Sequence, residues 1–142
     1  MCKMAIKKQA QHVHHIFSHF TNGLFPAASA YITLFLLTGN TLFENASLCC
    51  CAIGTIGAPI VYGSGLFDWR VRFKKRRVRI FTRKCYIGAA IVLISVMLIA
   101  FRLSLGDEFA TFGAVKYIFA GLIYLITGMV TYLGYLGGKF IV

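Results

Sequence analysis

Four histidines lie close together near the start of the chain, and they are the side chains best suited to chemistry. They are His12, His14, His15 and His19. If the chain is already helical here, His15 and His19 lie one turn apart on one face, with Asn22 nearby. Imidazoles at this spacing can hold a metal ion, contact a quinone head group or ligate haem iron. The same cluster also fits a structural role, in which histidines contact lipid headgroups and cap the start of a helix.

A haem at this cluster needs a second ligand from elsewhere. The axial ligands of haem approach from opposite sides of the ring, which two residues on one helix cannot readily do. No other histidine occurs in the chain. A bis-histidine haem therefore requires a second subunit or a partner protein, whereas a His–Met haem would recruit Met97 or Met129. We expect a haem b or quinone contact around His14, His15, His19 and Asn22.

The elements that position these histidines are predicted to be membrane helices. Hydrophobic residues make up 58% of the 142 residues and charged residues 13%, against roughly 45–50% and about 25% in soluble domains. Four apolar runs each have the roughly twenty residues that cross a bilayer. The prediction is an all-α integral membrane protein, with four transmembrane helices in an up-down bundle that forms one domain over 1–142. The predicted helices are about 16–38, 48–67, 85–104 and 112–137.

A basic segment, 68–84, separates the second and third predicted helices and holds nine of the fifteen Lys and Arg residues. With an even number of spans, this loop, the tail 1–15 and the C-terminus share one side of the membrane. That side then has thirteen basic residues and the other has two, Arg102 and Lys116. Because cytoplasmic loops are enriched in Lys and Arg, both termini and the loop are predicted to be cytoplasmic.

This segregated charge also determines which partners are expected. The chain offers no folded polar surface with aromatic platforms, so we expect no nucleic acid. A cytoplasmic basic loop instead favours membrane lipids, with anionic headgroups or a partner protein as its contact. The residues predicted to make that contact are Arg70, Arg72, Lys74, Lys75, Arg76 and Arg77.

Two residues at the start of the basic loop add a second candidate feature. Trp69 is of a type that favours the membrane interface. Asp68 is the one acidic residue on the predicted cytoplasmic side. The carboxylate either caps the helix and pairs with Arg70 or Arg72, or orients one of the histidines toward a ligand. Both residues are therefore included in the predicted cofactor site.

Glycines indicate where helices approach closely. Gly54 and Gly57 predict a closely packed or bent middle of the second helix. Gly121 and Gly128 are seven residues apart, so they fall on one face of the fourth helix. Such a face suits packing inside the bundle or between subunits, and we expect the former.

Three short motifs resemble a known family. His14-His15-Ile16-Phe17-Ser18-His19-Phe20 resembles the His-Pro-x-x-x-His-Phe-Pro opening of the bacterial membrane proteins called domain of unknown function 2231. Gly65-Leu66-Phe67-Asp68-Trp69 is similar to that family's Gly-x-x-Asp-Trp. Leu133-Gly134-Tyr135-Leu136-Gly137-Gly138 resembles its closing Gly-Trp/Tyr-Leu-Gly-Gly. The three matches stand in order and span nearly the whole chain.

The resemblance implies a four-helix, multi-pass protein of the bacterial inner (cytoplasmic) membrane, in a family without an established activity. Some relatives have a histidine near the start of the third helix and are suspected of binding haem. Here that region reads Arg83-Lys84-Cys85-Tyr86, and both prolines of the opening are replaced, by His15 and Thr21. His14 and His19 are the positions that match the family pattern, and they are the predicted ligands of haem iron or another metal.

Two functions follow from these observations. The first is a membrane subunit associated with electron transfer, in which His14 or His19 contacts haem b or quinone near the cytoplasmic face. The second is a non-catalytic anchor or scaffold subunit of a larger complex. No catalytic signature is present, so a stand-alone enzyme is not expected. The expected protein partners are further copies of the chain or other membrane or redox subunits.

Overall fold

Four helices make up the part of the chain that the structure, a computed structural model, describes, and no strand occurs in that part. The described backbone covers residues 2–72, 79–106 and 113–138, and the described side chains cover 16–67, 69–70, 79–106 and 113–137. The helices are α1 (Cys2–Thr38), α2 (Thr41–Arg72), α3 (Arg79–Leu105) and α4 (Val115–Gly138). The predicted all-α class with four helices is confirmed.

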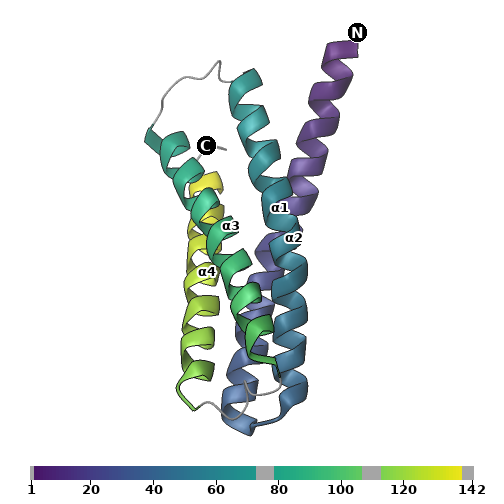
Figure 1. Ribbon diagram of the computed structural model, residues 1–142. Coiled ribbons are helices and arrows are strands. Elements are labelled where there is room, and N and C mark those ends of the chain that lie inside the picture. The colour runs from purple at the N-terminus through teal and green to yellow at the C-terminus, as the bar shows by residue number, and fades with distance from the viewer. Residues whose placement is uncertain (1, 73–78, 107–112, 139–142) are drawn as a thin grey trace.

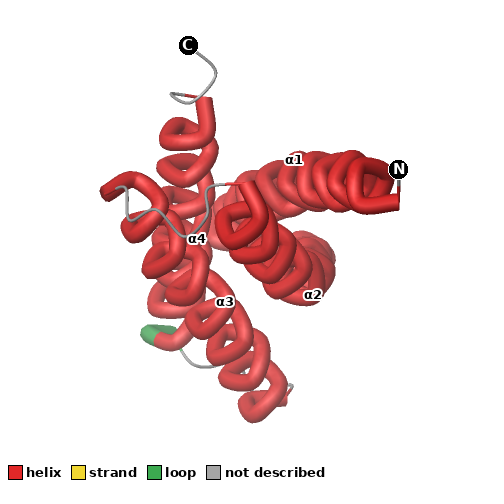
Figure 2. The backbone as a smooth tube through the Cα atoms, turned by 90° about the horizontal axis from the view of Figure 1, so that it is seen from above, coloured by secondary structure: helices red, strands yellow, loops and turns green. Residues whose placement is uncertain are grey.

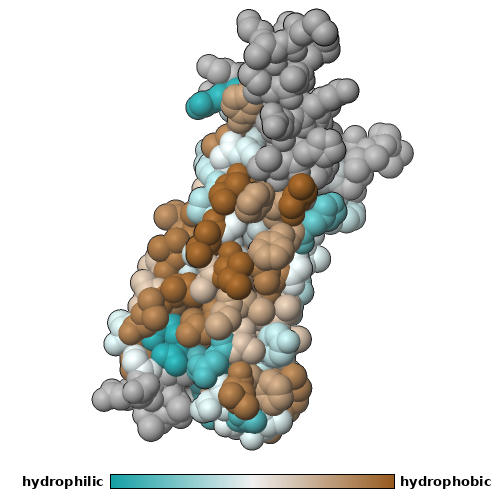
Figure 3. Space-filling view, turned by 90° about the vertical axis from the view of Figure 1, so that its right-hand side faces the viewer, coloured by the Kyte–Doolittle hydropathy of each residue, from teal (hydrophilic) through white to brown (hydrophobic). Residues whose placement is uncertain are grey.

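Each helix contains a segment that is long and apolar enough to cross a membrane. By length and composition these segments are Ile16–Thr38, Thr41–Phe67, Arg79–Leu105 and Val115–Gly137. A broad apolar surface occupies the middle of the face shown in Figure 3. At most 28% of each segment's most apolar stretch is buried inside the bundle. The remaining apolar surface faces outward, as expected for a protein whose solvent is lipid.

Helix boundaries differ from the sequence prediction at several points. Helix α1 begins at Cys2, so the segment 1–15, predicted as a tail, is helical from its second residue. Helix α2 begins at Thr41 instead of near 48 and continues to Arg72. Since α3 begins at Arg79, much of the predicted loop 68–84 is helix. Polar and basic residues continue a helix readily beyond its apolar part, so hydropathy located the candidate membrane spans better than it located the helix ends.

The link between α1 and α2 consists of two residues, Gly39 and Asn40. Gly39 has a φ of 69°, a left-handed conformation that glycine adopts without steric cost, and its N–H donates to the carbonyl of Phe35 at 2.8 Å. The side-chain oxygen of Asn40 accepts a hydrogen bond from the N–H of Leu42 at 3.0 Å. One residue therefore ends α1 and the next caps α2, which produces a tight antiparallel hairpin.

The four helices form an up-down bundle, in which each helix contacts its neighbours in the chain and α4 also contacts α1. Figure 1 shows the beginning of α1 and the end of α4 at the same end of the molecule. Viewed from above in Figure 2, α1 and α2 lie side by side, and α3 and α4 form a second pair. The contact between α1 and α2 is the most extensive of the four.

Glycines on α2 explain the close approach of α1. The ring of Phe25, which is fully buried, lies 3.1 Å from the position that a Cβ on residue 54 would occupy. The hydroxyl oxygen of Thr21 lies 2.8 Å from the corresponding position on residue 57. Closer to the link between α1 and α2, the hydroxyl of Ser47 donates to the carbonyl of Ala28 at 2.9 Å. The predicted close packing at Gly54 and Gly57 is confirmed.

Hydroxyl groups join α1 to α4 in the middle of the bundle. Ser29 and Thr127 share a hydrogen bond of 2.7 Å, and Thr127 also donates to the carbonyl of Phe25 at 3.0 Å. Nearer the end of α1, the hydroxyl groups of Thr33 and Tyr124 share a hydrogen bond of 2.6 Å. Hydrogen bonds between helices satisfy hydroxyl groups that lipid could not.

We expect Thr127→Val to lower the free energy of unfolding by about 0.6 kcal/mol, the average for interhelical hydrogen bonds in a membrane protein. Thr131→Val is the matched control, because the hydroxyl of Thr131 donates within its own helix, to the carbonyl of Thr127 at 2.8 Å. Unfolding of both variants would be measured in the same detergent micelles. An equal loss in the two variants would contradict a stabilising role for the link between α1 and α4.

Candidate functional site

His19 is the one histidine of the predicted cofactor site whose side chain the structure describes. It is exposed on α1, and Asn22, also exposed, lies about one turn further along. Residues 14 and 15 are part of the same helix, so His15 and His19 share a helix face as predicted. The side chains of His14, His15 and Asp68 lie outside the described residues. Among the described side chains, no group of three His, Cys, Asp or Glu residues is placed to hold a metal ion.

Two polar side chains, from α1 and α3, lie close to Gly134 and Gly137 near the end of α4. The amide nitrogen Nδ2 of Asn22 lies 3.8 Å from the position a Cβ on Gly134 would take, and Nζ of Lys84 lies 3.6 Å from that on Gly137. These two glycines belong to the closing motif found in the sequence. Their lack of a side chain allows an amide from α1 and an ammonium group from α3 to approach the α4 backbone. An ammonium group is favourable beside the last carbonyls of a helix.

Lys84 was missed as a site residue, because in the sequence it is one of nine cations in a segment assigned to a loop. The structure places it in α3, partly buried. Lys84 lies five residues after the start of α3. A correct prediction of where α3 begins would therefore have placed Lys84 on a helix of the bundle. The structure thus brings Asn22, a predicted site residue, to the same end of α4 as Lys84, which was not predicted.

The remaining described residues of the predicted site lie at the same end of the bundle. Trp69 is half-buried and Arg70 is exposed, both in the last turn of α2. Arg79 and Arg83, which were not among the predicted contact residues, are exposed in the first turns of α3. We call these three arginines, together with Lys84, the basic end. Of the other predicted contact residues, the side chain of Arg72 and all of Lys74, Lys75, Arg76 and Arg77 lie outside the described residues.

The opposite end of the bundle carries a buried ion pair between α2 and α3. Nε of Arg102 lies 2.7 Å from Oε1 of Glu44, and a second guanidinium nitrogen donates to Oε2 at 3.2 Å. The third donates to the carbonyl of Gly106 at 2.8 Å. The two side chains are only 13% and 5% exposed. Glu44 also lies in the first turn of α2, where the helix dipole favours a carboxylate.

The ion pair was not predicted from the sequence, because Glu44 and Arg102 are 58 residues apart in the chain. The second described cation at this end, Lys116, has its Nζ 5.3 Å from the centre of the Tyr117 ring, a cation–π distance. Both described cations at this end are therefore paired, one with a carboxylate and one with an aromatic ring. At the basic end, by contrast, three arginines are exposed.

Comparisons with known proteins add no identity to this geometry. No family model matches the chain, and neither a curated protein nor a solved structure does. The resemblance to the domain of unknown function 2231 family therefore stays a prediction carried by three short motifs.

Proposed function

We propose that this protein is a non-catalytic membrane anchor or scaffold subunit that binds anionic lipid headgroups at its basic end. The observation that carries the proposal is the unequal charge balance of the two ends. Arg70, Arg79 and Arg83 are exposed at one end, whereas Arg102 is neutralised by Glu44 at the other. Among the described residues, exposed arginines occur at the first end only.

The position of these cations along the helices suits a headgroup. They lie in the last turn of α2 and the first turns of α3, at the end of segments that can cross a bilayer. Guanidinium groups bind phosphate through paired hydrogen bonds. Basic residues next to a membrane helix are attracted to the anionic lipids of the cytoplasmic leaflet. We therefore propose that the basic end faces the cytoplasm, the orientation that the uneven distribution of Lys and Arg along the chain also predicts.

The test is a comparison of lipid binding by matched charge variants. We expect Arg79→Gln with Arg83→Gln to weaken retention of phosphatidylglycerol about fivefold for each charge removed, whereas Lys116→Gln, at the opposite end, leaves retention unchanged. Retention would be measured by native mass spectrometry of the protein released from mixed phosphatidylglycerol and phosphatidylcholine nanodiscs. An equal preference for the two lipids in the wild-type protein would overturn the proposal.

The competing proposal is the electron-transfer subunit, which rests on His19 at the same end as Asn22 and Trp69. An absorption spectrum of the protein purified from its native membrane separates the two proposals. A Soret band that His19→Ala abolishes would favour haem binding over a pure anchor. Without a Soret band, quinone binding that His19→Ala reduces would favour a quinone contact. If neither ligand is found, the anchor proposal gains support.

A further inference from the structure

One face of α4 is exposed along its whole length and repeats large and small residues in a regular order. Its positions are spaced alternately four and three residues apart, the pattern of a helix face that packs against another helix. All six positions are exposed. We call them the tyrosine–glycine stripe: Tyr117, Gly121, Tyr124, Gly128, Thr131 and Tyr135.

The two glycines of the stripe have no packing role inside the described bundle. A Cβ added at Gly121 or Gly128 would meet nothing within 4 Å of the described chain. The expectation that these glycines pack against the chain's own helices is therefore wrong. Glycine is among the least favourable residues inside a helix, whereas small residues allow membrane helices to associate closely. Gly121 and Gly128 therefore form a side-chain-free strip that faces away from the rest of the bundle.

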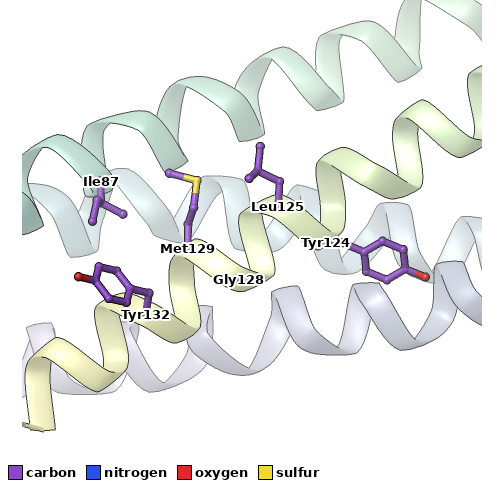
Figure 4. A pocket seen from close by; sticks show the side chains of 6 residues that line it. All are labelled: Ile87, Tyr124, Leu125, Gly128, Met129 and Tyr132. Atoms are coloured by element: carbon purple, nitrogen blue, oxygen red, sulfur yellow. The ribbon is translucent and has the colours of Figure 1, made fainter.

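A groove lies over Gly128, between two aromatic walls (Figure 4). Its volume is about 370 Å³, and it is lined by Ile87 of α3 and by five residues of α4. Figure 4 shows Tyr124 and Tyr132 at its two ends, with Gly128 between them, while Leu125 and Met129 project toward α3. The hydroxyl of Tyr124 is held by Thr33 at 2.6 Å, which fixes one wall of the groove.

We infer that the tyrosine–glycine stripe is the contact surface between two copies of this chain. The stripe supplies both ridges and hollows, so it is complementary to itself. All copies cross a membrane in one orientation, and a two-fold axis along the membrane normal therefore sets α4 against α4 in parallel. Gly128 then faces Gly128 of the other copy, and the tyrosine rings pack across the close approach that the glycines permit.

Charge and area also fit a second copy. None of the six residues of the stripe is charged, so two identical faces do not repel. The stripe residues Tyr117, Tyr124 and Tyr135 are 62%, 43% and 58% exposed, and the adjacent Tyr132 is 41% exposed. Together they expose about as much as two whole rings, on the order of 400 Å². Ile118 and Leu125 beside them are half exposed and extend the face toward the ~800 Å² per partner of a stable interface.

The test uses glycine substitutions that differ only in the face they alter. Gly128→Leu and Gly121→Leu each place a side chain on the stripe, and Gly63→Leu places one on an exposed part of α2. An added Cβ meets nothing within 4 Å of the described chain at any of the three, so none is expected to disturb the monomer. Dye-labelled full-length protein would be reconstituted in phosphatidylcholine vesicles over a range of protein-to-lipid ratios. Single-molecule photobleaching then counts the copies in each vesicle.

We expect wild-type protein and Gly63→Leu to dimerise alike, and the two stripe variants to have dissociation constants raised about tenfold or more. Gly128→Ala, which adds one methyl group and favours the helix, is expected to weaken the dimer by less. This milder variant keeps the test valid if a leucine variant loses helix content by circular dichroism. Wild-type protein that stays monomeric at every ratio, with or without a lipid chain retained in the groove, would overturn the inference. Stripe variants that dimerise as well as wild type would overturn it as well.

Discussion

Arg102→Gln is expected to lower the free energy of unfolding by about 3–5 kcal/mol, the cost of leaving one partner of a buried ion pair unpaired. The substitution leaves the Glu44 carboxylate, which is only 5% exposed, without its two guanidinium donors. It also removes the hydrogen bond to the carbonyl of Gly106, so the end of α3 loses a contact with the turn that follows it. Reversible unfolding in detergent micelles, followed by circular dichroism, would measure the loss.

A double-mutant cycle separates the ion pair from the other contacts of the arginine. Glu44→Gln in the Arg102→Gln background removes the unpaired carboxylate, and we expect the double variant to recover a large part of the lost stability. Lys116→Gln is the control for loss of a cation at this end, and it should change stability little because its cation–π contact is with the neighbouring Tyr117. Equal stability of Arg102→Gln and the double variant would show that the carboxylate does not depend on its partner.

Gly57→Ala is expected to cost about 1–3 kcal/mol, the usual cost of overpacking, although alanine is the better helix former. The added Cβ would lie 2.8 Å from the hydroxyl oxygen of Thr21, so either the Thr21 side chain or the two packed helices, α1 and α2, must shift. Gly63→Ala is the control, because its Cβ meets nothing within 4 Å of the described chain. That variant should gain stability, by about the propensity difference of 1 kcal/mol.

Thr21→Ala should relieve most of the cost of Gly57→Ala. Thr21 is 4% exposed, and its hydroxyl has no hydrogen-bond partner among the described residues. Its removal therefore costs little by itself and leaves space for the new methyl group. The free energies of unfolding of the two single variants and the double variant give the coupling between the positions. Additive losses would show that the strain of Gly57→Ala does not arise at Thr21.

The candidate site was predictable from the sequence only in outline. The histidines, Asn22 and Trp69 were identified by residue type and spacing. Asn22 does lie beside Gly134 near the end of α4, and Trp69 lies in the last turn of α2. Helix boundaries were less predictable, because a hydropathy pattern ends where the apolar residues end, whereas the backbone of α2 continues to Arg72. That extension moves the start of the basic segment onto a helix and leaves Arg70 exposed on its last turn.

The sequence by itself determined the all-α class and the four helices, because these features depend on a local property, the length of each apolar run. The two-residue link between α1 and α2 was not predicted, since α2 begins at Thr41 and not near 48. Only the tertiary structure decided which distant residues meet. Glu44 and Arg102 are 58 residues apart, and the packing of α2 against α3 brings their charges together. The same packing decided which glycines are covered: α1 covers Gly57, whereas Gly128 stays open because no helix of the described bundle covers that face of α4.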